Sequence, residues 1–215
     1  MDLNRRAAEM REFFDRKADG YDDVHAAFVM TKKLLTDVLP SRSEGEGGPD
    51  VLDLGGGTGL ELIPLFERFP DARVTVADIS PAMLGLLRKR PFADRVTAVC
   101  GDFFEVDFGE GRDAVISTSA LHHFTPEDKR ELYRRIWQCL KPGGLFLNSD
   151  KIVFTRREEE EGFAEYAADP GKYPHMDTPL APSTEVGLLE DAGFRRITVS
   201  LTDHENYRLF AAEKE

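Results

Sequence analysis

The stretch Val51-Leu52-Asp53-Leu54-Gly55-Gly56-Gly57-Thr58-Gly59 decides the fold of this chain. Its apolar start predicts a buried strand, and the glycines that follow let the backbone turn sharply without Cβ atoms in the way. A helix is expected after the turn, and its free N–H groups would face whatever binds there. A strand, a glycine loop and a helix in this order are typical of a nucleotide-like cofactor site.

The spacing of these residues bears on the kind of cofactor. The dinucleotide fingerprint G-x-G-x-x-G, counted from Gly55, requires a third glycine where the chain has Leu60. The sequence instead places Asp53, Gly55, Gly57 and Gly59 at alternate positions. A carboxylate here would repel a pyrophosphate but attract the ammonium group of an amino-acid-bearing cofactor. An NAD-dependent oxidoreductase is therefore the weaker alternative.

The rest of the chain alternates predicted strands and helices. Apolar runs predict strands over 51–54, 73–79, 95–100, 113–117 and 145–148, and helices over 60–68, 81–89, 126–140 and 183–192. Repeated strand–helix–strand units imply a parallel sheet. The last two predicted strands, 196–201 and 207–212, are joined by a loop too short for a crossover helix, so they should form an antiparallel hairpin.

Two further acids end neighbouring predicted strands. Asp78 ends the second strand, where a carboxylate can accept both hydrogen bonds of a ribose diol. Asp102 ends the third strand beside Phe103, a pair suited to an adenine amino group and ring. Either aspartate alone could be an ordinary turn or cap residue. Together with Asp53, they indicate a cofactor site at the strand ends.

The chain resembles the class I S-adenosylmethionine-dependent methyltransferases. The resemblance rests on five motifs in order, VLDLGGGTG (51–59), VADISPAML (76–84), GDFF (101–104), DAVISTSALHHF (113–124) and LKPGGLF (140–146). It implies an α/β fold with a Rossmann-like, mostly parallel seven-stranded sheet, an antiparallel last strand and helices on both faces. It also implies S-adenosyl-L-methionine as cofactor and methyl transfer by direct in-line displacement.

The resemblance further assigns roles to individual residues. The glycine loop, residues 55–59, would wrap the methionyl part of the cofactor, Asp78 would hold the ribose, and Asp102 would face the adenine. Tyr21 would belong to a lid over the cofactor. The residues expected to bind the cofactor are Tyr21, Asp53, Gly55, Gly56, Gly57, Thr58, Gly59, Asp78, Ile79, Met83, Asp102, Phe103 and Ser117.

The remaining segments are expected to complete a single methyltransferase domain over residues 1–215. Its expected parts are an N-terminal helical lid (1–40), a cofactor-binding core (45–150), an acceptor-side insertion (151–182) and a C-terminal helix and hairpin (183–215). The polar stretch 41–50 is expected to be a flexible linker.

A general base is needed only if the methyl acceptor arrives with a proton on the accepting atom. His122, His123 and Asp150 are the catalytic candidates, because they follow the fourth and fifth predicted strands, where open parallel sheets bind ligands. The candidates for acceptor binding are His122, Lys151, Tyr173 and His175. Each has a plainer alternative: packing at the sheet edge, pairing between neighbouring charges, or exposure in a loop.

Composition narrows the function classes. The chain has 28 basic and 40 acidic residues, a net charge of −12, which disfavours nucleic-acid binding. No apolar run approaches the roughly 18 residues of a membrane span, and the start has no apolar signal core, so a cytoplasmic enzyme with a small-molecule acceptor is expected. Cys100 and Cys139 have no disulfide or metal spacing; both are expected to be buried thiols, and no metal is expected. A homodimer, and a non-catalytic S-adenosylmethionine-binding or partner-regulating domain, stay open.

Overall fold

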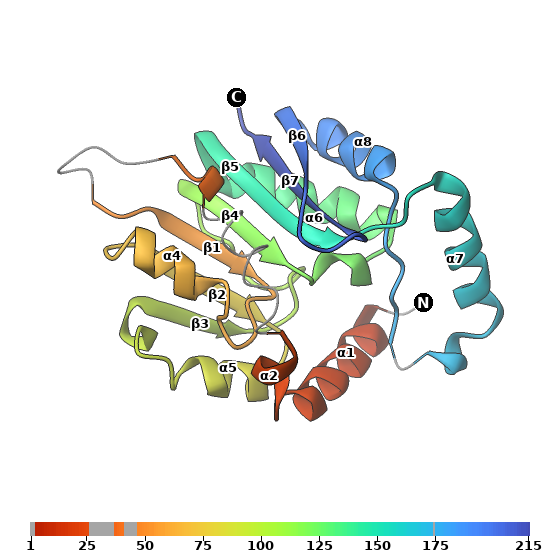
Figure 1. Ribbon diagram of the computed structural model, residues 1–215, viewed down its shortest axis with the longest axis horizontal. Coiled ribbons are helices and arrows are strands. Elements are labelled where there is room, and N and C mark those ends of the chain that lie inside the picture. Colours follow the sequence, from red (N-terminus) through yellow and green to blue (C-terminus); the bar gives the residue numbers. More distant parts are fainter. Residues whose placement is uncertain (1–2, 26–36, 41–46, 174) are drawn as a thin grey trace.

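The computed structural model describes residues 3–25, 37–40, 47–173 and 175–215. These residues form a seven-stranded sheet in the order β3-β2-β1-β4-β5-β7-β6 (Figure 1). The strands are β1 (Asp50–Leu54), β2 (Arg73–Asp78), β3 (Val96–Cys100), β4 (Arg112–Thr118), β5 (Leu140–Lys151), β6 (Arg195–Leu201) and β7 (Tyr207–Glu213). Strand β7 runs antiparallel to both β5 and β6, whereas β1 to β5 pair in parallel. The predicted fold class and the hairpin are confirmed.

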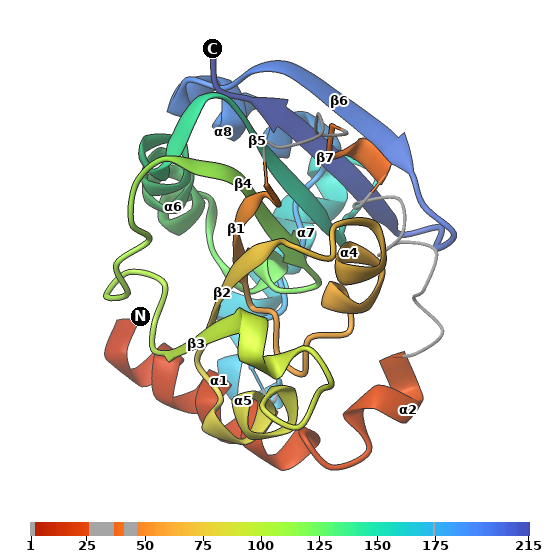
Figure 2. The same ribbon diagram turned by 90° about the vertical axis from the view of Figure 1, so that its left-hand side faces the viewer.

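Helices cover both faces of the sheet (Figure 2). The described helices are α1 (Leu3–Lys17), α2 (Tyr21–His25), α4 (Leu62–Arg68), α5 (Pro81–Leu87), α6 (Pro126–Cys139), α7 (Arg156–Ala168) and α8 (Pro182–Ala192). Leu52 packs in the core on the side of α6 and α8, and its neighbour Val51 in the core on the side of α4 and α5; both are completely buried. Burial of successive residues on opposite faces explains the continuous apolar runs of the central strands.

Local signals set the helix ends. The Ser80 hydroxyl accepts a hydrogen bond from the Met83 N–H at 3.1 Å and so caps α5. Thr125 and Asp128 form a reciprocal capping box at the start of α6. Helix α8 ends at Gly193, whose φ of 108° is left-handed, as the sequence predicted. Its start was predicted at Ser183, but the helix begins at Pro182.

Strand β5 differs most from the prediction. A helix stop and a turn were expected over 141–144, but the strand already begins at Leu140. Leu140 pairs with Arg112 of β4, and the Lys214 N–H donates to the Gly144 carbonyl at 3.0 Å. These pairings on both sides hold the segment in the sheet, although Gly143 has a left-handed φ of 76° and the pairing with β4 shifts register between Arg112 and Ala114.

The two cysteines also differ from each other. Both are free thiols, and Cys139 is buried as expected, but Cys100 is exposed. Cys100 is the last residue of β3, which forms one edge of the sheet, so only one neighbouring strand covers it. The expected linker, 41–50, falls largely outside the described residues, because residues 41–46 are not among them.

The first helix, α1, lies beside α5 near the ends of the central strands, and α7 stands off from the sheet on the same side of the molecule (Figure 1). Helix α7 belongs to the segment 151–182. Within the described residues, no helix has the length and apolar character needed to cross a bilayer.

Candidate active site

An open cavity lies at the carboxyl ends of β1 to β4. Its walls come from the segments that follow these strands, and from α1. The lining residues include Gly55, Gly57, Asp78, Ile79, Met83, Asp102, Phe103, Ser119, Ala120 and Tyr21. A second hollow, lined in part by Gly56, Thr58 and Glu61, shares Tyr21 and the glycine loop with it. The site therefore occupies the edge of the sheet where open α/β folds bind ligands.

The glycine loop brings bare backbone to this cavity. Gly55 has a φ of 78°, and a Cβ atom there would lie 2.4 Å from the Cβ of Ala120. Only glycine fits this position, because the conformation is left-handed and the neighbouring segment is too close. The Gly57 N–H donates to Asp78 Oδ2 at 2.9 Å, which ties the loop to the end of β2.

Asp78 is held rigidly and keeps an acceptor face toward the cavity. The Ser80 N–H donates to its Oδ1 at 2.8 Å, and only 8% of the residue is exposed. Burial raises the pKa of Asp78 to about 6, although the N–H groups of Ser80 and Gly57 oppose the rise. Near neutral pH the group is a carboxylate, which suits it to accept hydrogen bonds from a ribose diol.

Asp53 lies behind the glycine loop. It is completely buried, and a Cβ atom built on Gly56 would lie 2.4 Å from its Oδ2. Burial, and then the nearby Glu61, raise the pKa of Asp53 well above its usual value. Glu61 is itself 6% exposed and lines the second hollow; no sequence signal singled it out. Buried acids at this position fit a cofactor that carries an ammonium and a sulfonium charge, as S-adenosylmethionine does.

The structure brings together most of the residues predicted to bind the cofactor. Asp102 and Phe103 line the cavity, and Asp102 Oδ1 also accepts the Phe104 N–H at 2.9 Å. Asp53, Gly59 and Ser117 are not among the lining residues. Ser117 Oγ donates to the Leu54 carbonyl at 2.8 Å and joins β4 to β1. The lining residues directly after β4 are Ser119 and Ala120, followed by His123 and Phe124.

Helix α1 forms one wall of the cavity, and the sequence had not pointed to the individual residues of this helix that do so. Ala7, Met10 and Phe14 line the cavity at helical spacing, and this apolar stripe was the available signal. Arg6 lines it too, with an ion pair of 2.7 Å to Asp128, and its side chain is only 9% exposed. The ion pair thus ties α1 to the start of α6.

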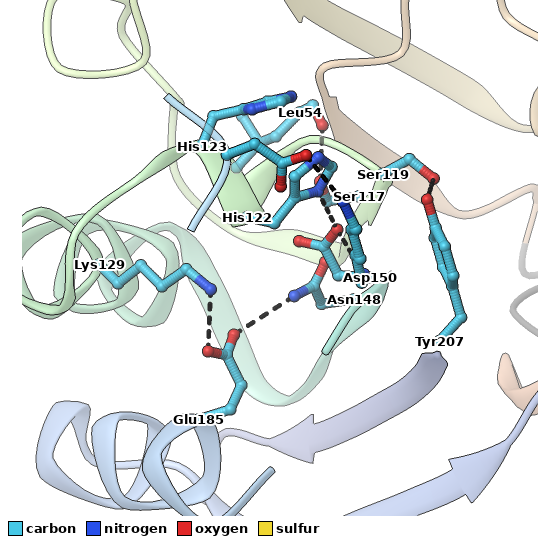
Figure 3. Close-up of polar contacts among 12 residues, drawn as sticks. Leu54, Ser117, Ser119, His122, His123, Lys129, Asn148, Asp150, Glu185 and Tyr207 are labelled. Carbon is cyan, nitrogen blue, oxygen red and sulfur yellow. Dashed lines mark hydrogen bonds and ion pairs between the residues drawn. The ribbon is translucent and has the colours of Figure 1, made fainter. Parts of the chain in front are cut away.

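His122 and Asp150 meet at the ends of the neighbouring strands β4 and β5 (Figure 3). His122 Nδ1 lies 2.6 Å from Asp150 Oδ1, and both side chains are buried. Burial alone would raise the pKa of Asp150, but the charge of His122 and its hydrogen bond outweigh burial and lower it. Asp150 is therefore an anion that accepts from Nδ1–H, which leaves Nε2 of His122 as the nitrogen able to take up a proton.

His123 differs from its neighbour. Its Nδ1 lies 2.8 Å from the Met176 carbonyl oxygen, which can only accept, so Nδ1 carries the proton. Burial, and then the neighbouring His122, lower the pKa of His123 well below its usual value. His123 lines the cavity as a neutral ring, and its environment disfavours holding a second proton.

The other candidates for acceptor binding differ in position: His175 and Lys151 lie near His123, whereas Tyr173 does not. The His175 ring lies 4.8 Å from that of His123 and 4.1 Å from that of Phe13. Lys151 Nζ pairs with Asp177 Oδ2 at 2.7 Å beside this cluster. The Tyr173 ring packs near that of Tyr166 and does not line the cavity. In the described ranges, no group of three or more metal-ligating side chains is placed to hold a metal ion.

Tyr207 was missed by the sequence analysis. Ser119 Oγ donates to its hydroxyl at 3.4 Å, which brings the first residue of β7 to the end of β4 (Figure 3). Burial raises the pKa of this phenol, and the nearby Asp150 and Asp177 add to the rise. The contact joins segments 88 positions apart and leaves no local signal.

A buried polar network lies behind the dyad (Figure 3). Lys129 Nζ and Glu185 Oε2 form an ion pair of 2.9 Å, and their side chains are 3% and 4% exposed. Asn148 Nδ2 donates to Glu185 Oε1 at 3.4 Å, and the Tyr133 hydroxyl also donates to this oxygen. The network ties α6 and α8 to the strand that carries Asp150.

Comparisons with known proteins agree with this geometry. Residues 51–144 match the model of a methyltransferase domain family. The chain is 26% identical to the carboxy-S-adenosyl-L-methionine synthase of Campylobacter lari over 94% of each protein. It is 33% identical to the malonyl-[acyl-carrier protein] O-methyltransferase of Acetivibrio thermocellus over 61% of this chain, but spans only 45% of that enzyme.

Two solved structures are similar in fold. Human N-acetylserotonin methyltransferase in complex with SAM has a TM-score of 0.66 at 23% identity, over 99% of this chain and 57% of that one. An O-methyltransferase family 2 protein from Planctomyces limnophilus, in complex with apigenin, has a TM-score of 0.71 at 18% identity, over 92% and 62%.

The sheet order, the glycine loop and the acids at the strand ends define a class I S-adenosylmethionine-dependent methyltransferase. Residues 51–144 carry the match to this methyltransferase domain, and S-adenosyl-L-methionine is its cofactor.

Proposed function

We propose that this enzyme methylates a small molecule whose accepting atom carries a proton, such as a hydroxyl or thiol, and that His122 is the general base. The observation that carries the proposal is the 2.6 Å contact between His122 Nδ1 and Asp150 Oδ1; His122 directly precedes His123, which lines the cavity. Asp150 orients the ring and stabilises the imidazolium that forms when Nε2 accepts the acceptor proton.

His123 is the less suitable base. Both histidines present a free Nε2 when neutral, but only His122 has a carboxylate to stabilise the added proton. His123 has the Met176 carbonyl at 2.8 Å and a low pKa caused by burial. We assign it the role of a neutral wall that can accept a hydrogen bond from the acceptor.

The residues around the cavity would hold the cofactor. Asp78 accepts from the ribose hydroxyls, Asp102 and Phe103 contact the adenine, and the glycine loop carries the methionyl part above Asp53. When bound, S-adenosylmethionine supplies a methyl group activated by its positive sulfur, which the acceptor takes by direct in-line displacement. Fixing the acceptor in that line contributes up to roughly 7–11 kcal/mol to lowering the barrier.

Several features support a small-molecule acceptor. The net charge of −12 disfavours phosphate-rich partners, and α1 already covers one wall of the cavity. Several similar proteins are O-methyltransferases, although the enzyme from Acetivibrio thermocellus acts on an acyl-carrier protein. We propose a cytoplasmic location.

A second candidate activity is the synthesis of carboxy-S-adenosylmethionine. Its support is that the relative from Campylobacter lari aligns over nearly the whole of both chains. A carboxylated cofactor needs a nearby cation. Of the described cations at this site, Lys151 is paired with Asp177 and Arg6 with Asp128, each at 2.7 Å. These pairings favour methyl transfer over carboxyl transfer.

One experiment distinguishes methyl transfer, the synthesis of carboxy-S-adenosylmethionine and a non-catalytic role. The enzyme is incubated with methyl-labelled S-adenosylmethionine and a panel of phenols, alcohols, thiols and amines, and all products are identified by mass spectrometry. We expect S-adenosylhomocysteine and a labelled acceptor, with turnover lost in His122→Gln but kept in the control His204→Gln. Carboxy-S-adenosylmethionine formed when carboxylate donors are added would support the second candidate. Tight cofactor binding without turnover on any acceptor would indicate a non-catalytic domain.

A further inference from the structure

Arg90 joins the glycine loop to the N-terminal helices. Its Nε donates to the Thr58 carbonyl at 2.9 Å, and its Nη2 donates to Asp22 Oδ2 at 2.5 Å. The Thr58 hydroxyl donates to the other carboxyl oxygen of Asp22 at 2.6 Å. These three side chains, which we term the clasp, close a ring between the segment after α5, the glycine loop and α2.

The clasp holds the part of the chain that covers the methionyl end of the cavity. Asp22 directly follows Tyr21, which lines both the main cavity and the second hollow. The Tyr21 ring stacks on that of His25, with centroids 3.9 Å apart and planes 11° apart. Position 22 thus fixes where this aromatic pair lies relative to the loop.

A second contact fastens the same helices to the other end of α5. Asp15 Oδ1 accepts from Ser80 Oγ at 2.6 Å and from the Ala82 N–H at 3.2 Å. The start of α5 therefore binds α1, and the residue shortly after its end binds α2. Between these two fastenings α5 contributes Met83 to the cavity. The N-terminal helices and α5 are joined on both sides of the space assigned to the cofactor.

We propose that Arg90 is a positioning residue for the cofactor: through Asp22 and Thr58 it keeps Tyr21 over the methionyl end, so that the cofactor is enclosed between the glycine loop and a closed N-terminal lid. Arginine suits this place because its planar fork can hold a carbonyl and a carboxylate at once, which a lysine ammonium does less well.

The expected effect follows from the population of the closed lid. Apparent affinity is reduced by the fraction of molecules in which the lid is open. The Arg90 and Asp22 side chains are 20% and 40% exposed, so the clasp is partly solvated and its loss has a moderate effect. We expect the dissociation constant for S-adenosylhomocysteine to rise by about tenfold.

The test measures binding of S-adenosylhomocysteine by calorimetry to Arg90→Gln, Asp22→Asn and the double variant. The matched control is Arg88→Gln, which removes the same charge from an exposed position two residues away. Arg90→Lys keeps the charge and should recover only part of the affinity. Hydrogen exchange of the amides in 3–25 is compared with that of β1, because a general loss of stability would accelerate both.

The proposal predicts that each single variant binds S-adenosylhomocysteine more weakly and exchanges faster in 3–25, while exchange in β1 is unchanged. Arg88→Gln should behave like the wild type. The double variant should bind no more weakly than the weaker of the two single variants. Affinity within about twofold of the wild type in Arg90→Gln, or additive losses in the double variant, would overturn it. If Arg90→Gln also accelerates exchange in β1, that variant is generally less stable. The affinity and the hydrogen exchange of Asp22→Asn then test the proposal in its place. No acceptor is present, so the outcome is independent of the proposed role of His122.

Discussion

His122 Nδ1 lies 2.6 Å from Asp150 Oδ1, with Asp150 near the end of β5 and His122 just after the end of the adjacent strand β4. The pairing of β4 with β5 places Thr118 opposite Ser149. The dyad is therefore held at the ends of two paired central strands, and sites on strands are positioned more precisely than sites on loops.

The first prediction concerns this dyad. His122→Gln removes the base, and Asp150→Asn removes the charge that stabilises the imidazolium. We expect each to lower kcat by roughly 10²–10⁴-fold with an acceptor found in the panel, while the dissociation constant for S-adenosylhomocysteine stays within about twofold. Steady-state kinetics and calorimetry provide the two readouts. Full activity in His122→Gln would remove it from the mechanism.

The second prediction concerns the ribose-binding acid. Asp78→Asn replaces an acceptor-only carboxylate by an amide that can offer just one acceptor oxygen, so binding of S-adenosylmethionine should weaken by about 10–100-fold. Asp94→Asn, at an exposed position before β3, is the control. Wild-type affinity in Asp78→Asn would contradict the assigned role.

The third prediction concerns pH. The pKa of Asp78 is raised to about 6 by burial, so its carboxylate becomes protonated below that pH and loses acceptor capacity. The affinity for S-adenosylhomocysteine should be constant above about pH 7 and fall as the pH drops below about 6, by up to tenfold per pH unit. Calorimetry across this range checks it. The same decline in Asp78→Asn would show that another group is responsible.

The raised pKa also affects stability. Because native Asp78 keeps its proton to higher pH than the unfolded chain, its ionisation costs stability as the pH rises from about 4 to about 6. Compared with Asp78→Asn, the wild type should lose free energy of unfolding across this window in urea titrations.

Much of this site could be predicted because its signals are local. Ser80 followed by Pro81, and Thr125 followed by Pro126, mark helix starts within a few residues, and the acids at 53, 78 and 102 end apolar runs. The clasp could not be predicted, because Asp22 and Arg90 are 68 positions apart and neither lies in a recognisable motif. The extension of β5 through Pro142 escaped prediction for a similar reason, since it depends on pairing with β4 and with the end of the chain.

The fourth prediction concerns the buried pair of Lys129 and Glu185. Glu185→Gln would leave the Lys129 ammonium buried without its counter-charge, so the free energy of unfolding should fall by about 3–5 kcal/mol. Replacing both residues, as in Lys129→Met/Glu185→Leu, should restore much of that loss. Urea denaturation at neutral pH measures both variants. Equal losses in the single and double variants would show that the ion pair is not the cause.

The fifth prediction concerns the N-terminal helices. Removing residues 1–24 takes away Tyr21 and the α1 wall of the cavity, so S-adenosylhomocysteine should bind markedly more weakly. Phe14→Ala, a milder change in the same wall, should weaken binding in the same direction. Unchanged affinity of both proteins in calorimetry would show that these helices do not contribute to the cofactor site.

The most direct test of the account is a crystal structure with S-adenosylhomocysteine bound. We predict that the ribose hydroxyls contact Asp78, that the adenine lies beside Asp102 and Phe103, and that the sulfur faces the space in front of His122 Nε2. Adenosyl density outside this cavity, or a sulfur turned away from the pair of His122 and Asp150, would contradict the account.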